Sequence, residues 1–152
     1  MSTPEGPENV TRDFTATAFV VWRGGVLLHK HRKLGRWFPP GGHVEPNEVP
    51  DDAAVREVLE ESGVRVALVG ERALPVLEPR QLVRPRGIQL ETISPGHEHI
   101  DLIYFAKPLP GYDGRLLDSD DSLGWYGQNA LAGLELIGEI RHWATLALLE
   151  LG

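Results

Sequence analysis

The chain has 152 residues, enough for one domain of ordinary size, and 41% of them are hydrophobic, as is typical of a globular protein. Its formal net charge of −7 argues against binding of polymeric nucleic acid, which requires a basic surface. The sequence has no cysteine, so disulfides, thiolate metal ligands and cysteine nucleophiles are excluded.

Residues 1–12 are polar, and we predict that they form a flexible lead-in to a single domain over residues 13–152. The opening letters MSTPEGPENV lack a basic region followed by an apolar stretch, which is the pattern of a secretion signal. No apolar run approaches the roughly 20 residues that a membrane span needs. We therefore expect a cytoplasmic protein without a membrane partner.

The first part of the domain carries strand signals followed by a loop. The letters FTATAFVVW, from Phe14 to Trp22, are rich in β-branched and aromatic residues and predict a strand. Val26–Arg32 predicts a second strand, and the two form a hairpin across a short glycine turn. The segment 33–48 is dense in glycine and proline, interrupted by Trp37 and Phe38, and predicts a loop.

Residues Pro50–Glu61 predict a helix. Proline suits its first turn, and Asp51 and Asp52 suit the positive end of its dipole. Gly63 suits the position just past its end.

The second half of the chain alternates strand and loop signals and ends in helix signals. We predict strands at Val64–Gly70, Gly87–Ser94 and His99–Pro108, a short strand near Trp125, and one or two helices over 130–151. Because strands precede and follow the central helix, the expected fold is α/β, with a mixed β-sheet between helices.

The predicted central helix carries three carboxylates on one face. Glu57, Glu60 and Glu61 are spaced i, i+3 and i+4, which places them within an arc of about 100°. The apolar residues Val55, Val58 and Leu59 lie largely on the opposite side and predict contact with a core. A glutamate face is usually only solvated, but these acids repel one another by a few tenths of a kcal/mol per pair and oppose the helix dipole. A hard divalent cation such as Mg²⁺ would offset this repulsion.

The loop before the helix offers groups that suit a phosphorylated substrate. Gly41 and Gly42 have no side chains, so a metal or a substrate can approach their backbone closely. Arg36 can pair with phosphate. Trp37 can stack on a base or can anchor the loop as a partly buried side chain.

The residues from Gly42 to Val64 resemble the Nudix box in full. The pattern of that family is G-x5-E-x7-R-E-U-x-E-E-x-G-U, in which U is a bulky apolar residue. The chain has Gly42, Glu48 after five residues, and after seven more the run Arg56-Glu57-Val58-Leu59-Glu60-Glu61-Ser62-Gly63-Val64. Every position matches, and the preceding loop RWFPPGGHVE is also similar to the family.

The resemblance implies a Nudix fold and Mg²⁺- or Mn²⁺-dependent hydrolysis of a nucleoside diphosphate linked to another moiety. It implies that Glu57, Glu60 and Glu61 carry the metal and that a backbone carbonyl of Gly41 or Gly42 completes the metal shell. It further implies that Glu48, Arg56 and Gly63 hold the box together and that Arg56 helps to orient Glu57. In this chemistry the cation polarises a P–O bond and lowers the pKa of a bound water, which attacks phosphorus.

Members of the family differ in which acid serves as the general base. Some use a glutamate of the box and others an acid of a later loop. The later candidates here are Glu98 in GHEHID and Asp118, Asp120 and Asp121 in LDSDDSLGW. Their position before Trp125 favours Asp120 or Asp121, although acidic loops are more often only solvated.

Two further clusters allow more than one interpretation. His97 and His99 can hold a metal, but two histidines at i and i+2 on a strand are more often structural. Arg80, Arg84 and Arg86 can grip a second phosphate or a sugar, but arginines in a long loop are more often solvated.

Several substrates and one alternative function remain open at this point. The substrate can be an oxidised nucleoside triphosphate, ADP-ribose, another nucleotide sugar or a dinucleoside polyphosphate. The alternative is a Nudix-like module that binds a nucleotide ligand without turnover, although the complete set of acids argues against it. Prenyl diphosphate isomerase chemistry is disfavoured because the family pattern needs a cysteine. Many relatives are dimers, so a homodimer is a further expectation.

Overall fold

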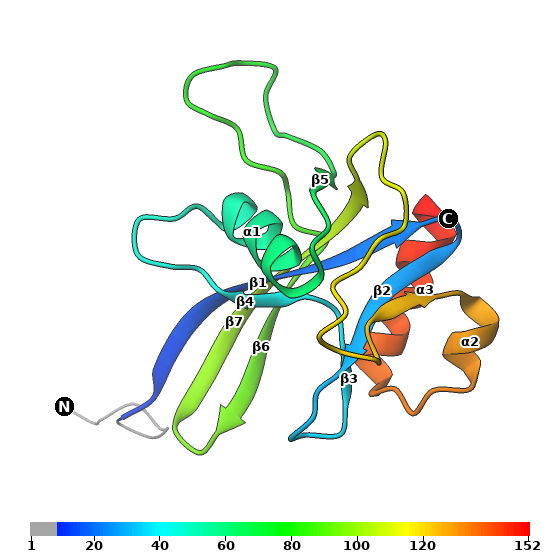
Figure 1. Cartoon of the computed structure of the whole chain (residues 1–152). Helices are drawn as coiled ribbons and strands as arrows, with labels where there is room; N and C mark the ends of the chain where they lie inside the picture. The colour runs from blue at the N-terminus through cyan, green and yellow to red at the C-terminus, as the bar shows by residue number, and fades with distance from the viewer. Residues whose placement is uncertain (1–8) are drawn as a thin grey trace.

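The computed structural model describes residues 9–152, and Figure 1 shows one twisted sheet with helices packed on it. Within that range, eight strands form a sheet in the order β3-β2-β1-β7-β5, with β4 paired to β1, β6 to β7 and β8 to β2. The elements are β1 (Thr11–Trp22), β2 (Gly25–Lys30), β3 (Trp37–Phe38), β4 (Gly41–His43), α1 (Pro50–Ser62), β5 (Val66–Val69), β6 (Gly87–Ser94), β7 (His97–Pro108), β8 (Gly124–Tyr126), α2 (Gln128–Ala132) and α3 (Gly138–Leu151). The mixed α/β fold predicted from the sequence is confirmed.

The centre of the sheet is a long parallel pair. Residues 11–20 of β1 lie in register with residues 97–106 of β7, whereas the β-hairpin of β1 and β2 and the other pairs are antiparallel. This pairing extends β1 to Thr11 and β7 to His97, so Thr11 and Arg12 belong to the sheet and not to the predicted lead-in. Of the remaining residues of that predicted lead-in, 1–8 lie outside the described residues.

The predicted loop over residues 33–48 contains two short strands. β3 pairs with the end of β2, where Trp37 lies opposite Lys30. β4 pairs with β1, where Gly41 lies opposite Thr17 and His43 opposite Thr15. The glycine and proline content concealed these strands, because each has only two or three residues, too few to show an alternating pattern. β4 is the element that brings the loop under the end of α1.

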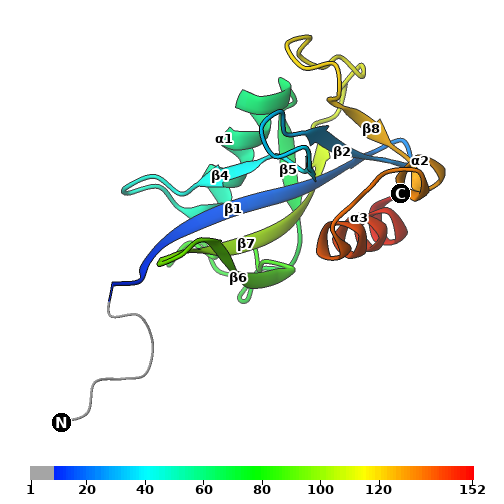
Figure 2. The same cartoon turned by 90° about the horizontal axis from the view of Figure 1, so that it is seen from below.

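The core lies on both faces of the sheet because successive residues of a strand point to opposite sides. Phe19 and Val21 point to the face that α3 covers, where Ile140 and Ala144 complete the cluster. Ala18 and Val20 point to the face that α1 covers, where they pack with Val58. Figure 2 shows α1 and α3 on the two sides of β1 accordingly. None of the helices in residues 9–152 is long and apolar enough to cross a membrane.

Beyond α3, the Phe19 face of the sheet is polar. The side chains that follow Phe19 toward the start of β1 are Thr17, Thr15, Asp13 and Thr11, and their partners on β7 are Ile103, Asp101, His99 and His97. On β6, Gln89 and Glu91 lie opposite Asp101 and His99. This polar stretch, which no helix covers in the way that α3 covers Phe19, provides the walls of a cavity.

Candidate active site

Helix α1 presents the three box glutamates in its last two turns. It ends at Gly63, which adopts a left-handed backbone conformation with φ of 80° and donates its N–H to the carbonyl of Leu59. Glycine adopts this conformation without steric cost, which explains the residue at the helix end. Val58 is fully buried in the opposite direction, so packing fixes which way the glutamates point.

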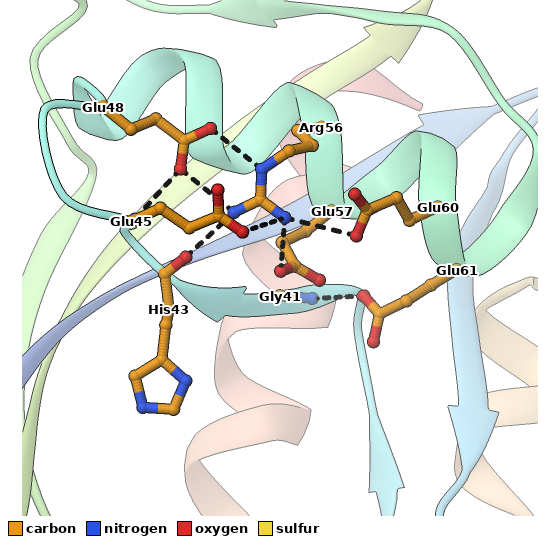
Figure 3. A network of polar contacts seen from close by, with 8 residues as sticks. All are labelled: Gly41, His43, Glu45, Glu48, Arg56, Glu57, Glu60 and Glu61. Carbon is orange, nitrogen blue, oxygen red and sulfur yellow. Dashed lines mark hydrogen bonds and ion pairs between the residues drawn. The ribbon is translucent and has the colours of Figure 1, made fainter.

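Arg56 connects the preceding loop to these glutamates (Figure 3). Its Nε and Nη2 donate to the two carboxylate oxygens of Glu48 at 2.8 and 3.0 Å, and Nη2 also donates to the carbonyl of His43 at 3.0 Å. Its Nη1 donates to Glu57 at 2.9 Å and to Glu60 at 3.2 Å. A planar guanidinium can make these bonds at once, and a lysine cannot. Arg56 therefore positions Glu57 and clamps the loop to the helix.

The same contacts correct one argument from the sequence. The repulsion among the box glutamates was expected to require a cation, but Glu57 and Glu60 share the guanidinium of Arg56. Hydrogen bonding to Arg56 also holds the pKa of Glu48 below its usual range. The repulsion that no arginine offsets is therefore the repulsion of the Glu61 carboxylate by Glu57 and Glu60.

Of the three box glutamates, Glu61 pairs with no basic side chain among residues 9–152. Its Oε2 accepts a hydrogen bond from the N–H of Gly41 at 2.8 Å. Burial raises the pKa of Glu61 to about 7, and the charges of Glu57 and Glu60 act in the same direction. A divalent cation beside this carboxylate would stabilise its ionised form.

The two glycines of the loop make room for protein atoms. A Cβ on Gly42 would lie 2.5 Å from the Oε1 of Glu57, and a Cβ on Gly41 would lie 2.7 Å from the Oγ1 of Thr17. The sequence predicted that a substrate approaches Gly42 closely. In the structure, the group that lies against Gly42 is the Glu57 carboxylate. Gly41 contributes its N–H to Glu61 and remains a prediction as a carbonyl ligand.

The box supplies a donor set that fits a hard cation. Glu57, Glu60 and Glu61 offer only oxygen, as Mg²⁺ and Mn²⁺ prefer. The Glu60 side chain is 58% exposed and can turn from Arg56 toward a cation, whereas Glu57 is 16% exposed and fixed by Arg56. Nudix hydrolases in general depend on divalent metals, and the residues present here are suited to that role.

A cavity of about 330 Å³ begins at Gly41, Gly42 and Glu61 and extends along the polar face of the sheet. Phe19, Phe38 and Ile140 give it an apolar wall, and Glu91, Asp101 and Glu139 give it an acidic wall. Of the described residues that line it, none is lysine or arginine. The cavity therefore suits an uncharged ring with hydrogen-bond donors better than a second phosphorylated group.

Asp101 is the central acid of this wall. It is 6% exposed, and the hydroxyls of Thr15 and Thr17 donate to its Oδ1 at 3.0 and 2.9 Å. Burial raises the pKa of Asp101 to about 7, and the nearby charge of Glu91 contributes. At neutral pH the carboxyl can therefore accept or donate a hydrogen bond.

A glutamine joins the other two acids of the wall. The Nε2 of Gln89 donates to Glu91 at 3.1 Å and to Glu139 at 2.7 Å, and Trp143 donates to its Oε1 at 2.6 Å. Burial raises the pKa of Glu139. This network fixes the acidic wall between the sheet and α3.

The sequence did not single out the acids of the cavity. Asp101 interrupts the apolar run HIDLIYFAKP, and a charge within a strand that is otherwise buried was the signal that could have found it. Glu91 and Glu139 carried no comparable signal, because acids in an edge strand and at the start of a helix are common.

The structure places other predicted residues outside the cavity walls. Arg36 is exposed, and Trp37 packs edge-to-face on Tyr126 with ring centroids 5.1 Å apart. Glu98 pairs with Arg12 at 2.9 Å. The structure therefore gives Trp37 a packing contact, and the roles of Arg36 and Trp37 toward a substrate remain predictions.

The acidic loop over residues 118–121 contacts a side chain that lines the cavity. Asp120 accepts hydrogen bonds from Ser122 and lies 3.5 Å from the Nδ1 of His29, which lines the cavity. Asp118 and Asp121 are exposed. Asp120 is thus the acid of this loop that the fold connects to the cavity.

The arginines of the segment 80–86 each pair with an acid. Arg80 pairs with Asp52 at 3.3 Å, Arg84 with Glu71 at 3.5 Å and Arg86 with Glu150 at 2.7 Å. The Arg80 and Arg86 pairs connect the long loop to α1 and α3, and all three pairs occupy the groups that were considered for a second phosphate.

A mixed sheet between helices, with a loop and helix that gather three glutamates at the mouth of a cavity, defines the Nudix class of domain. The family model for the NUDIX domain matches residues 11–147. The chain therefore belongs to the Nudix hydrolase family.

Known relatives agree with this assignment. A hydrolase of the NUDIX family from Clostridium perfringens has a similar structure, with a TM-score of 0.78 and 32% identity over 94% of this chain and 100% of that one. Diphosphoinositol polyphosphate phosphohydrolase 3-alpha from Mus musculus is 50% identical over 56 residues, which are 37% of this chain and 33% of the mouse protein. A putative 8-oxo-dGTP diphosphatase from Bacillus subtilis (strain 168) is 43% identical over 58 residues, 36% of this chain and 39% of that protein. The chain thus aligns with well under half of either curated relative.

Proposed function

We propose that this protein is a Mg²⁺- or Mn²⁺-dependent pyrophosphohydrolase that cleaves a diphosphate bond in a nucleoside diphosphate linked to another moiety. The observation that carries the proposal is the convergence of two separately held groups at one cavity mouth. Arg56 holds Glu57 and Glu60, and Gly41 holds Glu61 beside them. A clamp of this kind keeps acidic oxygens where a cation and a diphosphate can meet.

In the proposed mechanism, Glu57, Glu60 and Glu61 would hold the cation, with a carbonyl of the glycine loop as a further ligand. When bound there, a divalent cation would offset the charge of the diphosphate and would lower the pKa of a water that it holds. Arg56 fixes the Glu57 carboxylate through Nη1. The clamp restricts the motion of the acids, so less reorganisation is needed as charge develops on the leaving phosphate.

We assign the general base to the box, with Glu61 as the first candidate. Glu61 lines the cavity, and the N–H of Gly41 fixes its Oε2, so the carboxylate is held where it can accept a proton from a water in the cavity. Asp120 is the second candidate through its position beside His29. Asp121 and Glu98 rank lower because the former is exposed and the latter pairs with Arg12.

The acidic cavity favours a nucleoside over an inositol polyphosphate as the group that it receives. A phosphorylated inositol would face Glu91, Asp101 and Glu139, and like charges in a partly buried wall disfavour binding. A base ring can instead pack against Phe38 and Ile140 and donate N–H groups to the acids. We therefore rank nucleoside triphosphates and other nucleotides above the diphosphoinositol substrates named for the mouse relative.

A panel of substrates tests this proposal. The full chain is incubated with Mg²⁺ or Mn²⁺ and with oxidised and ordinary nucleoside triphosphates, ADP-ribose, a nucleotide sugar, a dinucleoside polyphosphate and a diphosphoinositol polyphosphate. Reaction in ¹⁸O-labelled water identifies the phosphorus that is attacked. We expect metal-dependent turnover of a nucleotide. Nucleotide binding without turnover would instead support a ligand-binding module, and preferred turnover of the inositol compound would overturn the argument from the cavity walls.

Oligomeric state and compartment rest on separate proposals. We propose a homodimer that acts in the cytoplasm on small nucleotides, without polymeric nucleic acid or membrane partners. Light scattering coupled to size exclusion tests the dimer, and a molar mass of one chain across micromolar concentrations would contradict it.

A further inference from the structure

Four polar side chains meet on the same sheet face at the start of β1. Asp13 comes from β1, His43 from β4, and His97 and His99 from β7, and we name this group the imidazole cluster. In the sheet register Asp13 lies opposite His99, while Thr15, two residues further along β1, lies opposite His43. Figure 3 shows the His43 ring pointing away from α1 while its carbonyl faces Arg56. The cluster is therefore formed by three neighbouring strands and is separate from the glutamates of the box.

The distances within the cluster match those between ligands of one metal ion. The Nε2 of His43 lies 3.2 Å from the Oδ2 of Asp13, and the Nε2 of His97 lies 3.4 Å from the same oxygen. Ligand atoms of Asp13, His97 and His99 all lie within 4.8 Å of one another. In a tetrahedral zinc site with Zn–N bonds of 2.0–2.1 Å, neighbouring ligand atoms are about 3.3–3.4 Å apart. The distances from Asp13 to His43 and to His97 are thus close to the distances between ligand atoms in such a site.

The remaining geometry brings the third imidazole close. The ring of His99 lies 4.9 Å from the ring of His43 and 5.1 Å from that of His97, measured between centroids. An ordinary histidine–aspartate pair needs one imidazole for one carboxylate. Here the imidazoles of His43 and His97, from two strands, contact the same oxygen of Asp13. The ring of His99 lies against both of them.

The neighbour of His97 fits a metal ligand as well. The Oγ1 of Thr11 lies 2.8 Å from the Nδ1 of His97 and can accept its N–H, while the threonine hydroxyl faces the carbonyl of Gly96. That arrangement leaves the Nε2 lone pair directed at Asp13. Metal-binding histidines commonly hold their second nitrogen in this way, which fixes both tautomer and ring orientation.

We propose that Asp13, His43, His97 and His99 form a binding site for a divalent transition metal ion of the zinc class, separate from the magnesium or manganese site of the box. Imidazole nitrogen suits Zn²⁺, Co²⁺ and Ni²⁺, whereas the oxygen ligands of the box suit harder cations. Among residues 9–152, Asp13, His97 and His99 are the group of three such side chains whose ligand atoms lie within 4.8 Å of one another, and His43 joins them through its contact with Asp13.

A cation in this site changes the electrostatics of the cavity. His43 and His99 line the cavity together with Glu91 and Asp101, so the bound ion places positive charge in a wall that is otherwise acidic. It also cross-links β4 to β1 and β7. Since β4 continues directly into the loop that Arg56 clamps, the ion stiffens the strand on which Glu61 is anchored through Gly41.

Metal binding to the full chain, free of any affinity tag, tests the proposal. Calorimetric titration with Zn²⁺ is combined with titration by Co²⁺, whose visible absorption distinguishes tetrahedral nitrogen-containing sites from octahedral oxygen sites. Two variants separate the two sites: His97→Ala/His99→Ala removes two of the four cluster residues, and Glu60→Gln/Glu61→Gln changes two of the three box glutamates. His142→Ala is the matched control, because this histidine lies on α3 outside the cluster.

We expect one equivalent of Zn²⁺ and a tetrahedral Co²⁺ spectrum in the unaltered chain, in the box variant and in the His142→Ala control. Both signals should be lost in the cluster variant, and Zn²⁺ should raise the melting temperature only where the cluster is intact. Asp13→Asn, which keeps the shape of the side chain, should lower the affinity at least tenfold and serves if the double alanine variant does not fold. Retention of the tetrahedral site in both cluster variants, or its loss in the box variant alone, would overturn the proposal.

Discussion

Glu61 of the box and His43 and His99 of the imidazole cluster line the same cavity, yet the chain builds the two groups in different ways. The glutamates lie within five residues on one helix, and one arginine and one backbone N–H hold them. The cluster draws on β1, β4 and β7, and its members contact one another directly. An arginine and a backbone N–H that are not themselves cation ligands hold the box acids, whereas His43 and His97 lie against a carboxylate that belongs to the cluster itself.

The largest effect is expected from the box. Glu60→Gln and Glu61→Gln should each lower turnover of the nucleotide substrate by about a hundredfold or more, because each removes a charge placed for the cation and the diphosphate. Steady-state kinetics at saturating Mg²⁺ measures this loss. Glu135→Gln, at an exposed glutamate between α2 and α3, is the control and should leave turnover unchanged. Equal rates in all of these variants would remove the box from the mechanism.

Asp101 lines the cavity, and its raised pKa makes the stability of the protein depend on pH. Because the folded chain keeps the proton of Asp101 to a higher pH than the unfolded chain, the contribution of Asp101 to the free energy of unfolding is fully present below the ordinary pKa of 3.8 and is lost as the pH rises toward about 7. The difference in stability between the wild type and Asp101→Asn should shift by about 2–3 kcal/mol between pH 5 and pH 8, in favour of the variant at high pH.

Denaturant titrations in the presence of a chelator measure this difference. Asparagine keeps an oxygen that the hydroxyls of Thr15 and Thr17 can donate to. Asp121→Asn, at an exposed position, is the control and should show no such pH dependence. If the stability of Asp101→Asn follows that of the wild type across this pH range, the burial of an ionised Asp101 is not costly.

Arg56 allows the counter-charge itself to be tested. Arg56→Lys keeps a positive charge but cannot serve Glu48, His43 and Glu57 together. We expect a loss of about 1–2 kcal/mol in stability and roughly tenfold in turnover. Thermal unfolding and kinetics are compared with Arg115→Lys, at an arginine whose side chain is 87% exposed and which should tolerate the change. A lysine that fully replaces Arg56 would show that charge alone, and not the fork of donors, organises the box.

The smallest effect is expected from the support of the imidazole cluster. Thr11→Val keeps the shape of the side chain and removes the hydroxyl beside the Nδ1 of His97. The affinity for Zn²⁺ should fall about tenfold, while turnover at the box stays the same. Thr92→Val, at an exposed position of β6, is the control for the same chemical change. Identical Zn²⁺ affinities in the two variants would show that His97 needs no support from Thr11.

Sequence patterns located most of the elements and explained part of the site. The strand signals predicted β1, β2, β6 and β7 with shifts of a few residues at their ends, and the capping signals predicted α1 to within one residue. The prediction of a loop at residues 33–48 missed β3 and β4, because strands of two or three residues are too short to show alternation. The sequence predicted that a substrate approaches Gly42, and the structure shows that the missing side chain of Gly42 makes room for Glu57.

By itself, the sequence determined the arrangement that the helix geometry fixes: Glu57, Glu60 and Glu61 share a face because residues three and four apart on a helix are neighbours. The placing of Asp101 and of His43 and His99 from the imidazole cluster around one cavity depended on the folded chain. Parallel pairing of β1 with β7 brings together residues that are far apart in the chain, and no local pattern specifies the register of such a pair. The physical reason is that helical contacts are local in sequence, whereas contacts across a sheet depend on how the whole chain has folded.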